Sequence, residues 1–104
     1  SQLMSTNYRL SQQVTKEQLL EAVADIGVTE HICENTTEES FCISDGESYM
    51  WCYMSDGKIY DFCRYGSNYD AEDFLYHAAD VLDLTLYSEH DDDYWEDEDD
   101  DEEI

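Results

Sequence analysis

The chain has 104 residues, and its 28 acidic side chains stand against four basic ones, which gives a formal net charge of −24. This length supports one domain with a single modest core. The charge excludes direct binding to nucleic acid or to anionic membranes, because both carry the same sign.

The first predicted element is a helix over residues 14–27, "VTKEQLLEAVADIG". Thr15 can cap this helix, and Gln18, three residues later, completes a capping box. Gly27 suits the left-handed conformation in which helices often end. The apolar residues that share one helical face, and so predict its buried side, are Leu19, Leu20, Val23 and Ile26. The outward carboxylates, spaced four apart along one ridge, are Glu17, Glu21 and Asp25.

Residues 28–35 predict a strand, and the chain then alternates between aromatic-rich runs and two Asp-Gly pairs at 45–46 and 56–57. Asp-Gly between alternating runs is the strongest short-range signal for a hairpin. The sequence therefore predicts an antiparallel meander of three to four strands.

Two-residue loops at these pairs set a register in which Ser44 lies opposite Glu47 and Ser55 opposite Lys58. One face of the meander then carries a set typical of a helix-covered core: Phe41, Ile43, Met50, Cys52, Met54, Ile59 and Cys63. The other face carries Cys42, Tyr49, Trp51, Tyr53, Tyr60, Phe62 and Arg64. Two interpretations of this aromatic face stay open, cross-strand pairs that stabilise the sheet or a partly exposed contact surface.

A second helix is predicted within residues 66–84, with Asn68 or Asp70 as its cap. Its apolar stripe is Phe74, Leu75, Ala78, Val81 and Leu82. A second row of carboxylates is predicted at Asp70, Asp73, Asp80 and Asp83.

The fold class is therefore α+β, a small two-layer domain with a β-meander flanked by two helices. We place the domain at residues 14–88, after an N-terminal segment 1–13 in which residues 1–3 are interpreted as a vector-derived remnant before Met4. Residues 89–104 hold twelve acidic side chains in sixteen positions, which predicts a tail that is disordered in isolation. Within the tail, the candidate partner-binding residues are Asp92, Asp93, Tyr94, Trp95, Glu96 and Asp97.

Catalytic and ligand-binding motifs are missing from the sequence. The chain has no glycine-rich phosphate loop, no nucleophile elbow and no histidine pair at metal-ligand spacing. The four cysteines lie nine to eleven residues apart without a C-x-x-C motif, which argues against a zinc site. We therefore expect no enzymatic activity, no metal and no cofactor. We favour reduced thiols for Cys33, Cys42, Cys52 and Cys63, with a disulfide-stabilised secreted module as the alternative.

Small size, scarce Lys and Arg, and the tail "DDDYWEDEDDDEEI" resemble the acidic DNA-mimic inhibitors of phages and other mobile elements. These include anti-restriction proteins, anti-CRISPR proteins and uracil-DNA glycosylase inhibitors. The resemblance is one of composition and strategy, with no shared motif. It implies that the chain binds a basic host defence or DNA-processing protein through the cationic site that would otherwise hold DNA or RNA. We expect a monomer or small homo-oligomer in the cytoplasm of a bacterial host cell, since the sequence shows no secretory signal and no apolar run of eighteen residues.

A second hypothesis is an acidic adaptor or chaperone that binds basic proteins through its tail. In that case Tyr94 and Trp95 fill an apolar pocket while the flanking carboxylates pair with surrounding cations. The two hypotheses differ in whether the folded domain or the tail provides the affinity.

Overall fold

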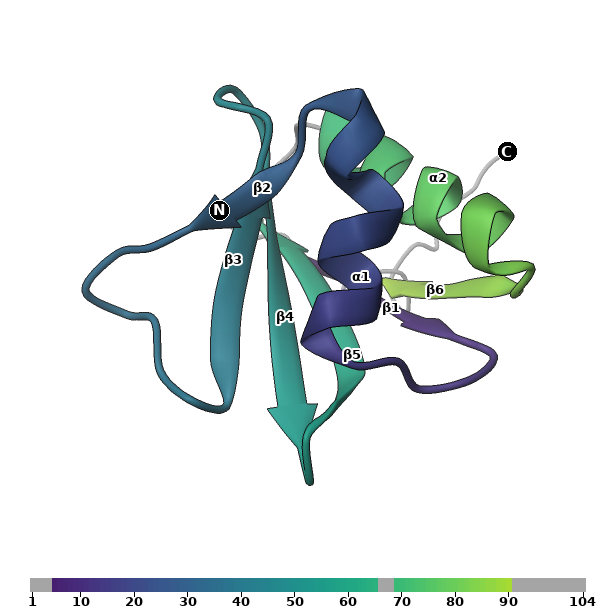
Figure 1. The fold of residues 1–104 in the computed structure, drawn as a ribbon, viewed down its shortest axis with the longest axis horizontal. Coiled ribbons are helices and arrows are strands. Elements are labelled where there is room, and N and C mark those ends of the chain that lie inside the picture. The colour runs from purple at the N-terminus through teal and green to yellow at the C-terminus, as the bar shows by residue number, and fades with distance from the viewer. Residues whose placement is uncertain (1–4, 66–68, 91–104) are drawn as a thin grey trace, which may run out of the picture.

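The computed structural model describes residues 5–65 and 69–90, which form one six-stranded antiparallel sheet and two α-helices (Figure 1). The elements in chain order are β1 (Ser5–Leu10), α1 (Lys16–Val23), the 3-10 turn η1 (Ala24–Ile26), β2 (Thr29–His31), β3 (Ser40–Ser44), β4 (Tyr49–Ser55), β5 (Lys58–Tyr65), the 3-10 turn η2 (Tyr69–Ala71), α2 (Glu72–Leu82) and β6 (Leu86–His90). The strand order is β2-β3-β4-β5-β1-β6. The predicted α+β class is confirmed, but the expected three to four strands are six.

The two additional strands come from the ends of the described chain. β1 lies inside the sheet, antiparallel to β5 on one side and to β6 on the other. Thr6, Tyr8 and Leu10 are buried, whereas Asn7 and Arg9 alternate with them on the opposite face. This two-residue period is the signal of a half-buried strand, and the sequence analysis left it unassigned.

Helix α1 begins as predicted. The hydroxyl of Thr15 accepts the amide N–H of Gln18 at 3.1 Å, and the Gln18 side-chain oxygen accepts the amide N–H of Thr15 at 2.9 Å. Gly27 ends the element with φ of 83°. Ile26 was wrongly assigned to the buried stripe. The chain tightens into the 3-10 turn η1, where the rotation about the helix axis is about 20° per residue larger than in an α-helix, and the Ile26 side chain is 41% exposed.

Helix α2 begins differently from the prediction. The residue at its N-cap is Ala71, which makes no side-chain cap, and Asp70 lies within η2 before it. Asn68, the other predicted cap, lies outside the described residues. Val81 was also wrongly assigned to the buried stripe, since it is 51% exposed while Ala79 is buried in the core.

The first hairpin differs from the predicted register. Ser44 lies opposite Tyr49, because the loop contains four residues instead of two. The Asp45 carboxylate accepts the amide N–H groups of Ser48 and Glu47, both at 2.9 Å, and these bonds lower the pKa of Asp45. The Asp45 side chain therefore caps a four-residue turn in place of the tight Asp-Gly turn expected from the sequence.

The second hairpin begins in the predicted register, with Ser55 opposite Lys58, and then shifts by one residue. Ile59 pairs with Met54 but Asp61 pairs with Tyr53, so Tyr60 is the extra residue of a β-bulge. The shift exchanges the faces beyond the bulge. Phe62 and Arg64, predicted for the aromatic face, are buried on the helix side, and Cys63, predicted for the core side, lies on the aromatic face.

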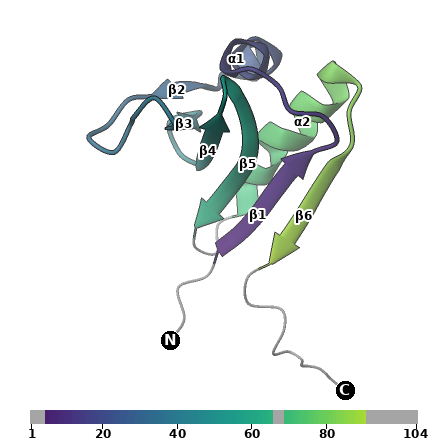
Figure 2. The same ribbon diagram turned by 90° about the horizontal axis from the view of Figure 1, so that it is seen from below.

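Both helices lie on one side of the sheet (Figure 2), and the hydrophobic core fills the space between the two layers. Its largest fully buried apolar side chains are Tyr8, Leu19, Phe41, Ile43, Met50, Phe62 and Leu75. Within the described residues, neither helix is long and apolar enough to cross a bilayer.

Arg64 is the largest fully buried side chain, at 1% exposure. Its Nε donates to the hydroxyl of Tyr8 at 3.1 Å, and its Nη2 donates to the hydroxyl of Thr6 at 2.8 Å. The ring of Tyr69 lies 4.0 Å from the guanidinium carbon, and Tyr8 donates in turn to the Glu72 carboxylate. Burial opposes the charge of Arg64, but the contacts with Tyr8, Tyr69 and Glu72 outweigh it and raise the Arg64 pKa.

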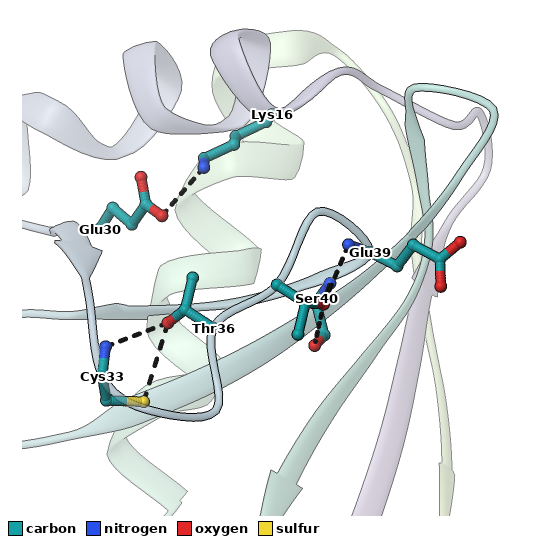
Figure 3. Close-up of polar contacts among 7 residues, drawn as sticks. Lys16, Glu30, Cys33, Thr36, Glu39 and Ser40 are labelled. Carbon is teal, nitrogen blue, oxygen red and sulfur yellow. Dashed lines mark hydrogen bonds and ion pairs between the residues drawn. The ribbon is translucent and has the colours of Figure 1, made fainter.

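A polar contact fastens α1 to the edge of the sheet. Lys16 Nζ donates to Glu30 on β2 at 2.9 Å (Figure 3). Beyond β2, the loop to β3 is shaped by threonine hydroxyls: Thr36 accepts the amide N–H of Cys33 at 3.1 Å, and Thr37 accepts that of Ser40 at 3.1 Å. The Lys16–Glu30 ion pair positions the first turn of α1 relative to β2.

We predict that Arg64→Leu destabilises the protein by about 1–3 kcal/mol, because the buried hydroxyls of Thr6 and Tyr8 each lose a hydrogen-bond donor. Arg9→Leu is the matched control. The guanidinium carbon of exposed Arg9 lies 4.7 Å from the centroid of the Tyr87 ring, and loss of this stacking contact costs about 1 kcal/mol or less. Urea unfolding followed by circular dichroism measures both. Equal losses for the two variants would contradict a structural role for the buried cation.

Candidate interaction surfaces

The carboxylates predicted on the first helix divide into two groups. Glu17 and Glu21 are exposed on α1, one turn apart, as expected. Asp25 is also exposed but belongs to η1, and its Oδ1 lies 2.9 Å from Nε2 of His77 on α2. Asp25 therefore links the two helices and does not continue the ridge of Glu17 and Glu21.

The second row is similarly divided. Asp73 and Asp80 are exposed on α2 seven residues apart, which is about two helical turns, so they share a side of the helix. Asp70 is exposed in η2. Asp83 is exposed at the C-cap of α2, in the left-handed conformation with φ of 59°. The regular part of the row thus consists of Asp73 and Asp80.

The two helices lie next to each other over the same sheet face, so their carboxylates belong to one surface (Figures 1 and 2). We call this surface the acidic helix layer, defined by Glu17, Glu21, Asp25, Asp73 and Asp80. A groove between the helices is lined by Gln18, Glu21, Ala22, Val81 and Leu82. The layer therefore combines exposed carboxylates with a narrow strip of apolar surface.

Little positive charge opposes this layer. Arg64 is buried, Lys16 pairs with Glu30, Arg9 stacks on Tyr87 on the other side of the sheet, and Lys58 lies at the β4–β5 turn. Of the seventeen carboxylates in the described residues, fourteen are exposed. The three partly buried ones each accept a hydrogen bond, Glu30 from Lys16, Asp61 from Asn7 and Glu72 from Tyr8.

The tail residues predicted to bind a partner, Asp92, Asp93, Tyr94, Trp95, Glu96 and Asp97, lie outside the described residues. Their role stays a prediction.

The opposite face of the sheet is covered by no element among residues 5–65 and 69–90. We call it the open sheet face and define it by the rings of Tyr49, Trp51, Tyr53, Tyr65 and Tyr87. The Tyr53 and Tyr65 hydroxyls are 3.0 Å apart, and the hydrogen bond between them contributes, together with burial, to raising the Tyr65 pKa. The register places no two of these rings directly opposite each other, since Tyr49 faces Ser44, Trp51 faces Cys42 and Cys63, and Tyr53 faces Ser40 and Asp61. Both interpretations of this face stay predictions.

Sequence reasoning missed the part of this face that β1 and the end of β5 supply. Asn7 donates to Asp61 at 2.8 Å, and Arg9 stacks on Tyr87. The alternation in Ser5–Leu10 was the available signal for β1. The position of Tyr65 depends on the bulge at Tyr60, for which the sequence carries no separate signal.

The described residues include no group of three or more side chains suited to hold a metal ion. His31 packs its ring edge-on against Tyr49 with centroids 5.1 Å apart, whereas Cys33 contacts the hydroxyl of Thr36 at 3.8 Å. His31 and Cys33, which lie two residues apart, are thus engaged with different partners.

Comparison with known protein families, with curated proteins and with solved structures finds no match for this chain. The functional argument therefore depends on the two surfaces described above.

We predict that only Cys33 reacts readily with a thiol reagent in the native protein. All four cysteines are free thiols, but Cys42, Cys52 and Cys63 are buried. Burial raises the Cys42 pKa to about 11 and that of Cys52 well above its usual value, so both stay protonated at neutral pH. Absorbance on reaction with an aromatic disulfide reagent should show one fast equivalent, absent in Cys33→Ser, and four equivalents after denaturation. Fewer than four would indicate a disulfide and support the secreted alternative.

Proposed function

We propose that this protein is a nucleic-acid mimic that binds and inhibits a DNA- or RNA-binding protein by occupying its cationic site. The observation that supports this proposal most is the acidic helix layer. The basic side chains of α1 and α2 are His77, which pairs with Asp25 of this layer, and Lys16, which pairs with Glu30 on β2. Ordinary protein surfaces mix both signs.

The spacing of the charges is compatible with mimicry. Glu17 and Glu21 are separated by about 6 Å along the axis of α1, given a rise of about 1.5 Å per residue. One DNA strand places a phosphate about every 3.4 Å along its axis. A single helical row therefore reaches roughly half the charge density of one strand, and two adjacent helices together approach the density of a strand.

The layer is also rigid enough to act as a template. α1 is held by buried Leu19, Ala22 and Val23, and α2 by buried Phe74 and Leu75. The Asp25–His77 contact links the two helices at 2.9 Å. Because the backbone that carries these carboxylates is fixed before binding, association requires less loss of backbone conformational entropy than a flexible polyanion would require.

A cationic groove that normally holds a duplex gains affinity by releasing the ions condensed on the phosphates. A dense array of carboxylates offers the same gain, and the net charge of −24 increases the rate of association with a basic partner. The resemblance to phage inhibitors suggests a bacterial defence protein, such as a restriction or CRISPR component, as the target in the host cytoplasm. The strip formed by Val81 and Leu82 provides apolar contact beside the charges.

The first test compares two sets of four neutralised carboxylates. We expect Glu17→Gln/Glu21→Gln/Asp73→Asn/Asp80→Asn to weaken target binding by about 10- to 100-fold, since each exposed ion pair contributes about 0.2–1 kcal/mol. The matched control, Glu34→Gln/Glu38→Gln/Glu39→Gln/Glu47→Gln, removes the same charge from exposed positions away from the helices. The target is first isolated on immobilised protein from a bacterial lysate and identified by its release with short duplex DNA. Titration calorimetry at several salt concentrations then compares the variants.

Mimicry requires that the first set of substitutions weakens target binding strongly and the second set weakens it little. It also requires that the affinity depends less steeply on salt concentration only for the first set. Equal effects would show that overall charge, and not the helix layer, is recognised. Capture that neither duplex DNA nor RNA displaces would remove the basis for mimicry.

The second test separates mimicry from the tail-driven adaptor. A chain ending at residue 90 should keep most of its affinity for the isolated target, because the helix layer is intact. Residues 89–104 fused to an unrelated soluble domain should bind weakly. If the fusion instead binds as tightly as the full chain, the adaptor hypothesis is correct and the helix layer is not the binding surface.

A further inference from the structure

The open sheet face differs in chemistry from the rest of the surface. It runs over all six strands, and its centre consists of Trp51, Tyr53 and Tyr65, with Tyr49 and Tyr87 towards the edges. Tyr49, Tyr65 and Tyr87 are 46%, 48% and 45% exposed. An antiparallel sheet with one solvated face normally carries small polar residues there, so this density of half-exposed rings indicates a surface that another layer covers.

Carboxylates are scarce on this face. The alternation of the strands places only Asp61 and Glu89 on it, and Asp61 is half-buried and accepts a hydrogen bond from Asn7. Arg9 lies on the same face, stacked on Tyr87. The face is therefore close to neutral on a chain of charge −24.

This charge distribution indicates which kind of partner covers the open sheet face. A basic partner is attracted to the acidic helix layer and gains little electrostatic energy on a near-neutral face. The acidic residues 91–104 of the same chain would find few counter-charges there, Arg9 and, at the β4–β5 turn, Lys58. A second copy of the chain, by contrast, can approach only where carboxylates are few, and the open sheet face is that place.

In such a pair of chains, the two acidic helix layers are far enough apart for their mutual repulsion to be weak. Two packed sheets lie about 10 Å apart, and a helix layer lies about 10 Å behind each sheet, so the two acidic helix layers would be roughly 30 Å apart. The Debye length at physiological salt is about 8 Å. Repulsion between the layers is therefore largely screened.

The open sheet face is also large enough for a specific interface between two chains. Six strands about 4.8 Å apart and about 17–20 Å long give on the order of 500 Å² of flat surface per chain, and accessible area exceeds flat area. Specific interfaces need about 1,000 Å² in total. Shallow hollows in this face meet at Tyr53 and Tyr65, where side chains of a facing sheet can interdigitate.

We propose that the protein forms a two-fold symmetric homodimer in which the open sheet faces pack against each other. The acidic helix layers then face outward on opposite sides of the dimer. Trp51, Tyr53 and Tyr65 form the centre of the interface, and Arg9, with Glu89, lies towards its rim. This proposal is independent of the proposed function, since it concerns the other face of the sheet.

The experiment is sedimentation velocity on the full chain under reducing conditions at physiological salt, from low to high micromolar concentration. We expect a dimer whose fraction rises with concentration and rises further as salt is increased from low to physiological levels. Tyr65→Glu should raise the dimer dissociation constant by about 10-fold or more, because it places a charge at the centre of the interface. Tyr76→Glu is the matched control, since Tyr76 is 56% exposed on α2, on the other side of the molecule, and should leave dimerisation within about 2-fold.

Circular dichroism establishes that each variant is folded, and Tyr87→Glu replaces Tyr65→Glu if the latter unfolds. Oxidative labelling of tyrosines, read by mass spectrometry, provides a second measurement: Tyr49, Tyr65 and Tyr87 should become protected as concentration rises, whereas Tyr76 should not. A monomer at all concentrations would overturn the proposal. Protection of these tyrosines in a chain that sediments as a monomer would point to residues 91–104 as the cover and would also overturn the proposal. A dimer weakened by Tyr76→Glu and not by Tyr65→Glu would place the interface on the helices and overturn it as well.

Discussion

The fold depends on a single constraint, that one face of one sheet must hold the whole hydrophobic core of a chain with a charge of −24. Both helices pack on that face, so every exposed carboxylate of α1 and α2 is directed away from it. Repulsion among those carboxylates opposes compaction, and the buried side chains of the helices and the sheet compensate for it. Because the helices are fixed by this packing, the backbone positions of their acidic residues are set before any partner arrives.

Arg64 reinforces this arrangement from inside. It is one of only four basic residues in the chain, yet it lies at 1% exposure instead of neutralising the surface. Its contacts with Thr6 and Tyr8 connect β5 to β1, and the bond from Tyr8 to Glu72 extends the connection to α2. Buried charges of this kind are costly unless fully paired, so the network also specifies how β1 and α2 meet. The surface is left with almost no compensating charge.

Two surfaces of opposite character result, an acidic helix layer and an aromatic open sheet face. They suit different partners, because the first attracts cations and the second offers apolar area with little charge. A protein that inhibits by mimicry through one face and pairs with itself through the other would present two copies of its acidic surface to the solvent. Each role can be removed by substitutions on one face without affecting the other, since the sheet and its core separate the two.

The sequence by itself determined the α+β class, the capped start of α1, the left-handed end at Gly27 and the exposure of the carboxylates predicted on and beside the two helices, because these depend on local spacing and on solvation. The bulge at Tyr60 is a tertiary feature: it exchanges the faces of Phe62, Cys63 and Arg64, and only the register against β4 and β1 selects it. Tertiary packing likewise joined Asp25 to His77, recruited Ser5–Leu10 into the sheet and left the aromatic face uncovered within residues 5–65 and 69–90. These contacts join residues distant in the chain, and no local pattern encodes which distant strand or helix a segment will meet.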